Sequence, residues 1–297
     1  MEIVKSGRRV MNPFLDWCFK YLFGTEENKP NLIGFLNLML MPQSPIVDVE
    51  FMNNESLPSS PDIKECVFDI VCKDQNGDRY LIEVQNGKMI EIKDRIIYYT
   101  CRLMDRMGKR GSGWNYSDIK RVYTICLMNF TFESNPKLRR DIQLYDIDDN
   151  TLFSDKINII MLQLPCLKAE SLGECKANYE LLLYLLKEMQ AGMKTIDQLK
   201  QEIANTTLPQ KTKEVFYRVL DTADVGSLSE KDQMRYESAL KNYLDTMSCI
   251  EYATVKVREE GKAEAKVSIA KSMKAEGMNA AVISRCTGLS LEQIEAL

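Results

Sequence analysis

The segment Asp-Gln-Asn-Gly at residues 74–77 constrains the fold of this chain more than any other, because it separates two strand-like runs. These runs, residues 65–73 and 79–85, are rich in the β-branched and aromatic residues that strands prefer. Asn-Gly between such runs is typical of a tight β-hairpin turn. If the loop contains three residues, Gly77 takes the left-handed position of a bulged turn. The segment therefore predicts an antiparallel strand pair.

This loop length also predicts which side chains meet across the hairpin. Asp74 pairs with Asp78, and Asp69 then falls opposite Glu83. The Cβ atoms of directly opposite residues are about 4.5–5.5 Å apart. Gln85 lies two residues beyond Glu83 and so on the same face. Two carboxylates and an amide are expected to converge on one patch.

The paired carboxylates allow two interpretations. Like charges opposite each other destabilise a strand pair, and Asp69 interrupts an apolar run where a charge is costly unless it is paired or bound to metal. A divalent cation between Asp69 and Glu83 explains both features. The alternative is a pair of ordinary strand carboxylates in water, because single Asp and Glu residues in exposed strands are common. An Asp…Glu-x-Gln spacing alone is a weak signal.

The chain has no histidine, which narrows the available chemistry. Ser-His-Asp and Cys-His catalysis, histidine-ligated zinc and histidine general bases are all excluded in their usual forms. Clustered carboxylates prefer hard cations such as Mg²⁺. The nine cysteines form no C-x-x-C motif, so we interpret them as reduced, mostly buried thiols of a cytoplasmic protein rather than a zinc site.

Charge and hydropathy restrict the partners. The net charge is −4, so a nucleic acid would have to be held by a local basic patch. No apolar run reaches the roughly 18 residues of a membrane span, and the amino-terminal segment lacks the apolar core of a signal peptide. No contact with a membrane is expected.

The order of the other elements predicts the fold class. Over the first 165 residues the expected order is α-β-β-β-α-β, which indicates an α/β sandwich with a mixed central sheet. A helix over residues 12–24 would have Asn12 as its N-cap and Pro13 in its first position. The other expected elements are a helix over 30–41, a strand over 46–52, a helix over 90–108 and strands over 120–130 and 156–165.

The carboxyl-terminal part of the chain has the sequence pattern of helices rather than of strands. Residues 170–250 are helical in pattern, and a charged, alanine-rich stretch follows from residue 251. Two short helices are expected in 279–297, with a capping box from Ser290 to Gln293 in the second. The predicted division is an α/β domain, a helical region and a charged helical tail with a short helix-turn-helix-like end, over residues 1–166, 167–250 and 251–297.

Basic residues gather after the second strand of the hairpin. On the expected helix, Arg95, Arg102 and Arg106 recur at helical spacing near one face, and Lys88 precedes them. Such residues can grip phosphates, and Tyr99 can stack on a base. The alternatives are a solvated helix face and a tyrosine of the core.

Five segments, taken in order, resemble the PD-(D/E)XK nuclease family transposases, also known as Rpn-type recombination-promoting nucleases. The resemblance covers roughly residues 10–165. The segments are Asp-Trp-Cys-Phe-Lys-Tyr-Leu-Phe-Gly from Asp16, Val-Phe-Asp-Ile-Val around Asp69, Leu-Ile-Glu-Val-Gln around Glu83, the helix that begins near Arg95, and the segment from Gly113 to Val122. The tail also resembles those that often follow this domain.

The resemblance implies a restriction-endonuclease-like fold and Mg²⁺-dependent (or Mn²⁺-dependent) cleavage of DNA, linked to recombination or mobile elements. Asp69 and Glu83 would hold the metal, and Gln85 stands where the superfamily usually has lysine. Gln85 can orient a water molecule by hydrogen bonding but carries no positive charge. Asp16 would add an outer carboxylate; the alternative is a surface Asp that favours the helix dipole.

Other functions stay open at this point. The same fold could serve as a catalytically weak or inactive module that binds nucleic acid or protein. Residues 279–297 could form a small helix-turn-helix, but Arg285 is their only basic residue, so a tail that binds a protein partner or another copy is favoured. A homodimer would suit double-strand cleavage.

Overall fold

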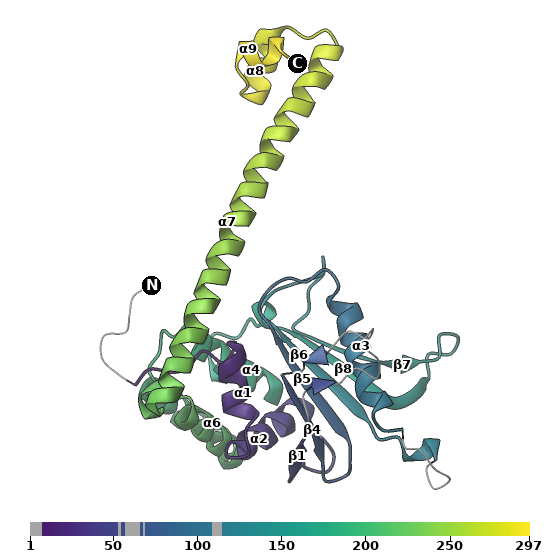
Figure 1. The fold of residues 1–297 in the computed structure, drawn as a ribbon, viewed down its shortest axis with the longest axis vertical. Helices are drawn as coiled ribbons and strands as arrows, with labels where there is room; N and C mark the ends of the chain where they lie inside the picture. The colour runs from purple at the N-terminus through teal and green to yellow at the C-terminus, as the bar shows by residue number, and fades with distance from the viewer. Residues whose placement is uncertain (1–7, 53–54, 57–65, 68, 109–114) are drawn as a thin grey trace. The chain divides into compact units, whose positions relative to one another are not determined.

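The computed structural model describes residues 8–52, 55–56, 66–67, 69–108 and 115–297 (Figure 1). Most of the glycine-rich loop before residue 115, including Gly113, and Phe68 of the second resembling segment lie outside the described residues. The chain divides into two compact units, residues 1–239 and 240–297. The sheet and every residue of the predicted site belong to the first unit.

A mixed six-stranded sheet forms the centre of the first unit. Its order is β1-β4-β5-β6-β8-β7; β5, β6 and β8 are parallel and the other neighbours antiparallel. A separate ribbon pairs β2 with β3. The predicted α/β fold with a mixed sheet is thus confirmed. The strands are β1 (Val49–Phe51), β2 (Glu55–Ser56), β3 (Cys66–Val67), β4 (Ile70–Asp74), β5 (Arg79–Gln85), β6 (Val122–Met128), β7 (Arg139–Tyr145) and β8 (Leu152–Gln163).

Helices precede, interrupt and follow the strands. In the first unit they are α1 (Asp16–Phe23), α2 (Lys29–Leu40), α3 (Ile92–Asp105), α4 (Asn178–Ala191), α5 (Ile196–Ala204) and α6 (Gln210–Thr222). Short 3₁₀ turns lie at η1 (Tyr116–Asp118), η2 (Leu164–Cys166), η3 (Leu172–Glu174) and η4 (Val225–Ser227). Helix α7 (Glu230–Ala275) begins in the first unit and continues into the second, which ends with α8 (Ala280–Thr287) and α9 (Leu291–Glu295).

The hairpin register agrees with the prediction. Val71 pairs with Leu81, and the Asp74 N–H donates to the Asp78 carbonyl oxygen at 2.9 Å. Gly77 has φ 84°, the left-handed conformation that the three-residue loop requires. Continued by one residue beyond β4, this register sets Asp69 opposite Glu83.

The predicted strand over 65–73 is wrong in one respect, because it is broken into β3 and β4. Strand β3 pairs with β2 in the small ribbon, and β4 begins only at Ile70. The Val84 N–H donates to the Asp69 side chain at 2.8 Å, so a donor that could have continued the strand ladder is used by a carboxylate. The interruption therefore occurs at a site residue.

The first helix begins three residues later than predicted. Asn12 does not cap it; its side-chain oxygen accepts the Phe14 N–H at 2.9 Å in a local turn, and Leu15 occupies the N-cap position. Pro13 lies in this turn rather than in the helix. The turn places Asp16 at the first position of α1.

Helix α3 covers one face of the sheet. Ile92 and Ile96 pack with Cys126 of β6, and Leu103 packs with Leu81 of β5. Residues of β5 alternate between faces, so Glu83 and Gln85 point to the same side as Leu81, towards α3. On the other side of β5, α1 and α2 approach the sheet (Figure 1).

The second unit is a small helical cluster. Ala270, Ile283 and Ile294 form its buried core, and Gly288 ends α8 with φ 72°. The capping box predicted for Ser290 is present at the start of α9. The prediction of two short helices is confirmed. In the described part of the chain, no helix is long and apolar enough to cross a bilayer.

Candidate active site

Asp69 directly precedes β4, and Glu83 lies on the neighbouring strand β5, close to Arg95 of α3. The hydrogen bond from the Val84 N–H to Asp69 Oδ2 is 2.8 Å long and ties the first carboxylate to the strand that carries the second. The exposed fraction is 15% for the Asp69 side chain and 4% for that of Glu83, so both carboxylates are largely removed from water. The two acids predicted to meet are brought together.

Glu83 is the more deeply buried acid. Its Oε2 atom lies 3.4 Å from Gln85 Nε2, which donates to it, and 3.6 Å from a guanidinium nitrogen of Arg95. Its Oε1 atom is buried with no hydrogen-bond partner among the described residues. An orphaned carboxylate oxygen in such a place is costly unless a cation or water reaches it.

Both carboxyl groups have raised pKa values. Burial raises the pKa of Glu83 most, the Asp69 charge raises it further, and Arg95 opposes the rise. Burial is also the main cause that raises the pKa of Asp69, with the hydrogen bond from Val84 acting against it and the neighbouring Asp16 adding to it. A buried acid whose ionisation is hindered further by a neighbouring acid, as Glu83 is by Asp69, is a frequent mark of a functional site.

A lysine that the sequence analysis did not select reaches this pair from α1. Lys20 Nζ lies 2.8 Å from Asp16 Oδ1 and 3.6 Å from Asp69 Oδ1. Burial lowers the pKa of Lys20, but Asp16 and Asp69 outweigh it and raise the pKa, so the ammonium stays charged. The signal was present in the sequence, because Asp16 and Lys20 have the i, i+4 spacing of an ion pair within the first resembling segment.

Asn86 fixes the start of α1 against the end of β5. Its side-chain amide donates to the Phe14 carbonyl oxygen, just before the helix begins. Sequence reasoning also missed this residue, since nothing local marks it. The contact sets the position of Asp16 and Lys20 relative to Glu83.

The predicted nucleic-acid-binding residues are distributed along α3 and the loop before it. The Arg95 guanidinium carbon lies 4.9 Å from the ring centroid of Tyr99, so these two are brought together at the acid pair. Arg102 lies further along α3, 3.8 Å from Asp105, and Lys88 is exposed in the loop. At the end of α3 the Arg106 carbonyl oxygen accepts a hydrogen bond from Arg79.

Two arginines, Arg79 and Arg106, bring positive charge to the carboxyl end of α3. Burial lowers the pKa of Arg79, and the Arg106 charge lowers it further. The Arg79 guanidinium also donates to the Leu103 carbonyl oxygen at 3.0 Å, which satisfies the carboxyl end of the helix. Positive charge therefore continues along α3 away from the acid pair.

Asp69 and Glu83 are the side chains suited to hold a divalent cation here. No cluster of three or more His, Cys, Asp or Glu side chains fit for a metal occurs among the residues described. The pair offers hard oxygen ligands, and Oε1 of Glu83 lacks another partner. These features fit Mg²⁺ or Mn²⁺ with further oxygen ligands from water or a phosphate.

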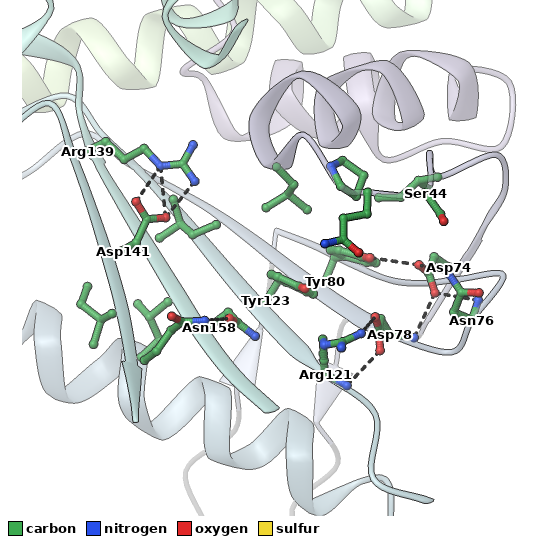
Figure 2. A pocket seen from close by; sticks show the side chains of 18 residues that line it. Ser44, Asp74, Asn76, Asp78, Tyr80, Arg121, Tyr123, Arg139, Asp141 and Asn158 are labelled. Carbon is green, nitrogen blue, oxygen red and sulfur yellow. Dashed lines mark hydrogen bonds and ion pairs between the residues drawn. The ribbon is translucent and has the colours of Figure 1, made fainter. Parts of the chain in front are cut away.

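A cavity of about 610 Å³ on the other face of the sheet contains none of the predicted site residues (Figure 2). Its carboxylates bind partners within the protein. The Tyr80 hydroxyl donates to Asp74 at 3.0 Å, and Asp78 accepts the Arg121 N–H at 3.0 Å. The Tyr80 ring stacks on Tyr123 with centroids 5.2 Å apart. The carboxylates that line this cavity are therefore hydrogen-bonded within the protein, and we interpret them as part of the structure rather than as a second active site.

A mixed sheet flanked by helices, with an Asp just before one strand and a buried Glu on its neighbour, is consistent with a nuclease-like α/β protein of the PD-(D/E)XK class. The model of the PD-(D/E)XK nuclease family transposases matches residues 13–253, and the chain belongs to this family. No curated protein sequence and no solved structure matches it.

Proposed function

We propose that this protein is a metal-dependent DNA endonuclease that hydrolyses phosphodiester bonds at Asp69 and Glu83. The observation that carries the proposal is the largely buried carboxylate pair, in which one oxygen of Glu83 has no hydrogen-bond partner among the residues that the structure describes. Membership of a nuclease family supports the reaction class. Substrate and cofactor follow from the chemistry of the side chains.

Asp69 and Glu83 would hold Mg²⁺ or Mn²⁺. A bound divalent cation supplies Lewis acidity and favours ionisation of water, which phosphodiester hydrolysis needs at neutral pH. Burial raises the pKa values of both carboxyl groups, so the pair would release protons when a cation binds to it.

The positive charge that lysine usually supplies would come from Lys20 instead of residue 85. Its ammonium lies 3.6 Å from Asp69 and can stabilise negative charge that develops on a phosphate. The Gln85 amide donates to Glu83 and orients that carboxylate. Asp16 holds the ammonium of Lys20, which makes it a positioning residue rather than a metal ligand.

The basic side of α3 supports a nucleic-acid substrate. Arg95 lies 3.6 Å from Glu83, and Arg102, Arg106 and Lys88 extend the positive charge from there. A phosphate backbone that follows these residues would pass the acid pair. Tyr99 packs against the core with the Arg95 guanidinium over its ring, so it would orient Arg95 towards a phosphate rather than stack on a base itself.

Plasmid nicking with Mg²⁺ and with Mn²⁺ tests the proposal. The variants Asp69→Asn and Glu83→Gln keep the size and hydrogen-bonding capacity of the side chains, and we expect each to lower the cleavage rate by at least about 100-fold. The matched control is Glu50→Gln, an exposed carboxylate on β1 that binds Lys73. Equal cleavage by wild type and both site variants would overturn the assignment.

A second function is favoured by Gln85, whose neutral amide stands where the superfamily usually has lysine. The protein would then bind nucleic acid or another protein without cleaving. The same assay separates the two functions. If wild type cleaves no double-stranded, single-stranded or RNA substrate with either metal but still binds one of them, the binding function holds and the nuclease proposal fails.

A further inference from the structure

The hairpin formed by β7 and the start of β8 carries an exposed apolar surface. Strand β7 lies at the edge of the sheet (Figure 1), and within the described residues β8 is its one neighbour. Large apolar side chains on this hairpin are 40–95% exposed. These side chains are Ile142, Leu144, Tyr145, Ile147, Leu152 and Phe153. An edge strand with exposed apolar side chains can pair with a strand of another molecule.

On the face of β7 that carries Ile142 and Leu144, the charge changes sign about Gln143. Arg140 lies near the start of the strand, where it also forms an ion pair with Glu133, and Asp146 follows the end of the strand; Arg139 is paired with Asp141 on the other face. Gln143 lies midway between Arg140 and Asp146, with Ile142 before it and Leu144 after it. A strand face that runs from Arg140 through two apolar side chains to Asp146 is complementary to itself when two copies run antiparallel.

We propose that β7 is the docking surface for β7 of a second copy of this chain. In an antiparallel pair centred on Gln143, Ile142 of one copy lies opposite Leu144 of the other, and Arg140 lies opposite Asp146. The two-fold axis repeats each pair, so every favourable contact occurs twice. Main-chain hydrogen bonds along the free edge would join the two sheets into one.

The acidic turn argues against DNA as the occupant of this surface. Asp146, Asp148 and Asp149 lie together after β7, and each is exposed. Such a group repels a phosphate backbone, whereas Asp146 complements Arg140 of another copy. The proposed contact uses no residue of the acid pair, so it does not depend on nuclease activity.

Sedimentation velocity of the full chain over a range of concentrations measures the association. We expect wild type to dimerise and Leu144→Lys, which sets an ammonium opposite Ile142, to weaken the dimer at least about tenfold. The matched control is Glu214→Lys, an exposed charge reversal on α6. Far-ultraviolet circular dichroism checks that each variant folds.

Charge reversal gives an independent measurement of the register. We expect Asp146→Arg alone and Arg140→Asp alone to be monomeric, and their equimolar mixture to form a heterodimer in which both pairs are again opposite in sign. Because Arg140 also forms an ion pair with Glu133 and donates to the Asn135 carbonyl oxygen within its own chain, Leu144→Lys remains decisive if Arg140→Asp fails to fold. A wild type that stays monomeric at roughly 100 µM, or a dimer that Leu144→Lys leaves unchanged, would overturn the proposal.

Discussion

The Lys20 ammonium lies 3.6 Å from the Asp69 carboxylate, although the two residues belong to different elements far apart in the sequence. The side chain is held from its other side by Asp16 at 2.8 Å. A cation fixed in this way needs little reorganisation when charge develops on a substrate. In the proposed function, Lys20 would take the place of the ammonium that Gln85 lacks.

Replacement of Lys20 by alanine is expected to lower the cleavage rate about 100-fold, because the fixed positive charge beside Asp69 is lost. Lys20→Arg should keep part of the rate. Lys29→Ala is the control, since Lys29 also forms an ion pair at 2.9 Å but lies on α2 away from the acids. Steady-state cleavage of a labelled duplex measures the effect, and an unchanged rate in Lys20→Ala would contradict the assignment.

A lysine restored at position 85 is expected to rescue the loss. Gln85 lies next to Glu83, with its amide nitrogen 3.4 Å from Oε2, so an ammonium on this side chain can occupy the same region. The double variant Lys20→Ala/Gln85→Lys should recover at least about tenfold over Lys20→Ala alone. Equal rates for the double and single variants would indicate that a positive charge at position 85 cannot replace the one at Lys20.

The raised pKa values of Asp69 and Glu83 predict how stability depends on pH. The folded, metal-free protein retains protons that the unfolded chain releases near pH 4, so the free energy of unfolding falls from that pH up to the raised values. Glu83→Gln removes most of this loss. At pH 8 we expect its unfolding free energy to exceed that of wild type by about 1–2 kcal/mol, or its Tm by about 3–6 °C.

Addition of Mg²⁺ is expected to stabilise wild type at pH 8 and so to oppose the advantage of Glu83→Gln. Because the cation requires the ionised pair, it should raise the Tm of wild type more at pH 8 than at pH 5.5 and leave Glu83→Gln nearly unchanged. Differential scanning calorimetry with and without Mg²⁺ measures both effects. A Mg²⁺ response that is equal in wild type and Glu83→Gln would place the cation elsewhere.

Arg95 is expected to contribute to nucleic-acid binding. It lies 3.6 Å from Glu83 and stacks on Tyr99, so a phosphate near the acid pair would meet its guanidinium. In an Asp69→Asn background, Arg95→Ala should weaken duplex binding and reduce the slope of log K against log salt by about one. Lys93→Ala is the control on the same helix, because Lys93 binds Glu133 at 2.9 Å.

Gly34 permits the close contact between α2 and α6. A Cβ atom at this position would lie 2.6 Å from Val215 Cγ1, so Gly34→Ala is expected to destabilise the protein by about 1–3 kcal/mol despite its better helix propensity. Val215→Ala removes the obstructing methyl groups. The double variant should therefore be more stable than Gly34→Ala alone, as urea unfolding can measure.

Much of the hairpin followed from the sequence alone, because its determinants are local. Asn76-Gly77 fixes the loop, the loop fixes the register, and the two-residue period of a strand then sets Asp69 opposite Glu83. Local signals also determined the end of α8 at Gly288. The prediction failed at Asn12, because an N-cap residue and a turn residue share the same side-chain chemistry.

Only the tertiary structure decided what surrounds the acid pair. Lys20 reaches Asp69 because Asn86 holds the residue before α1, and Arg95 reaches Glu83 because Ile92 and Ile96 seat α3 on the sheet. The exposed edge strand β7 was likewise not expected, since its polar and apolar residues give no clear period. Contacts between distant elements depend on how buried surfaces fit, which no local pattern encodes. The sequence by itself determined the two carboxylates, and packing determined the charges beside them.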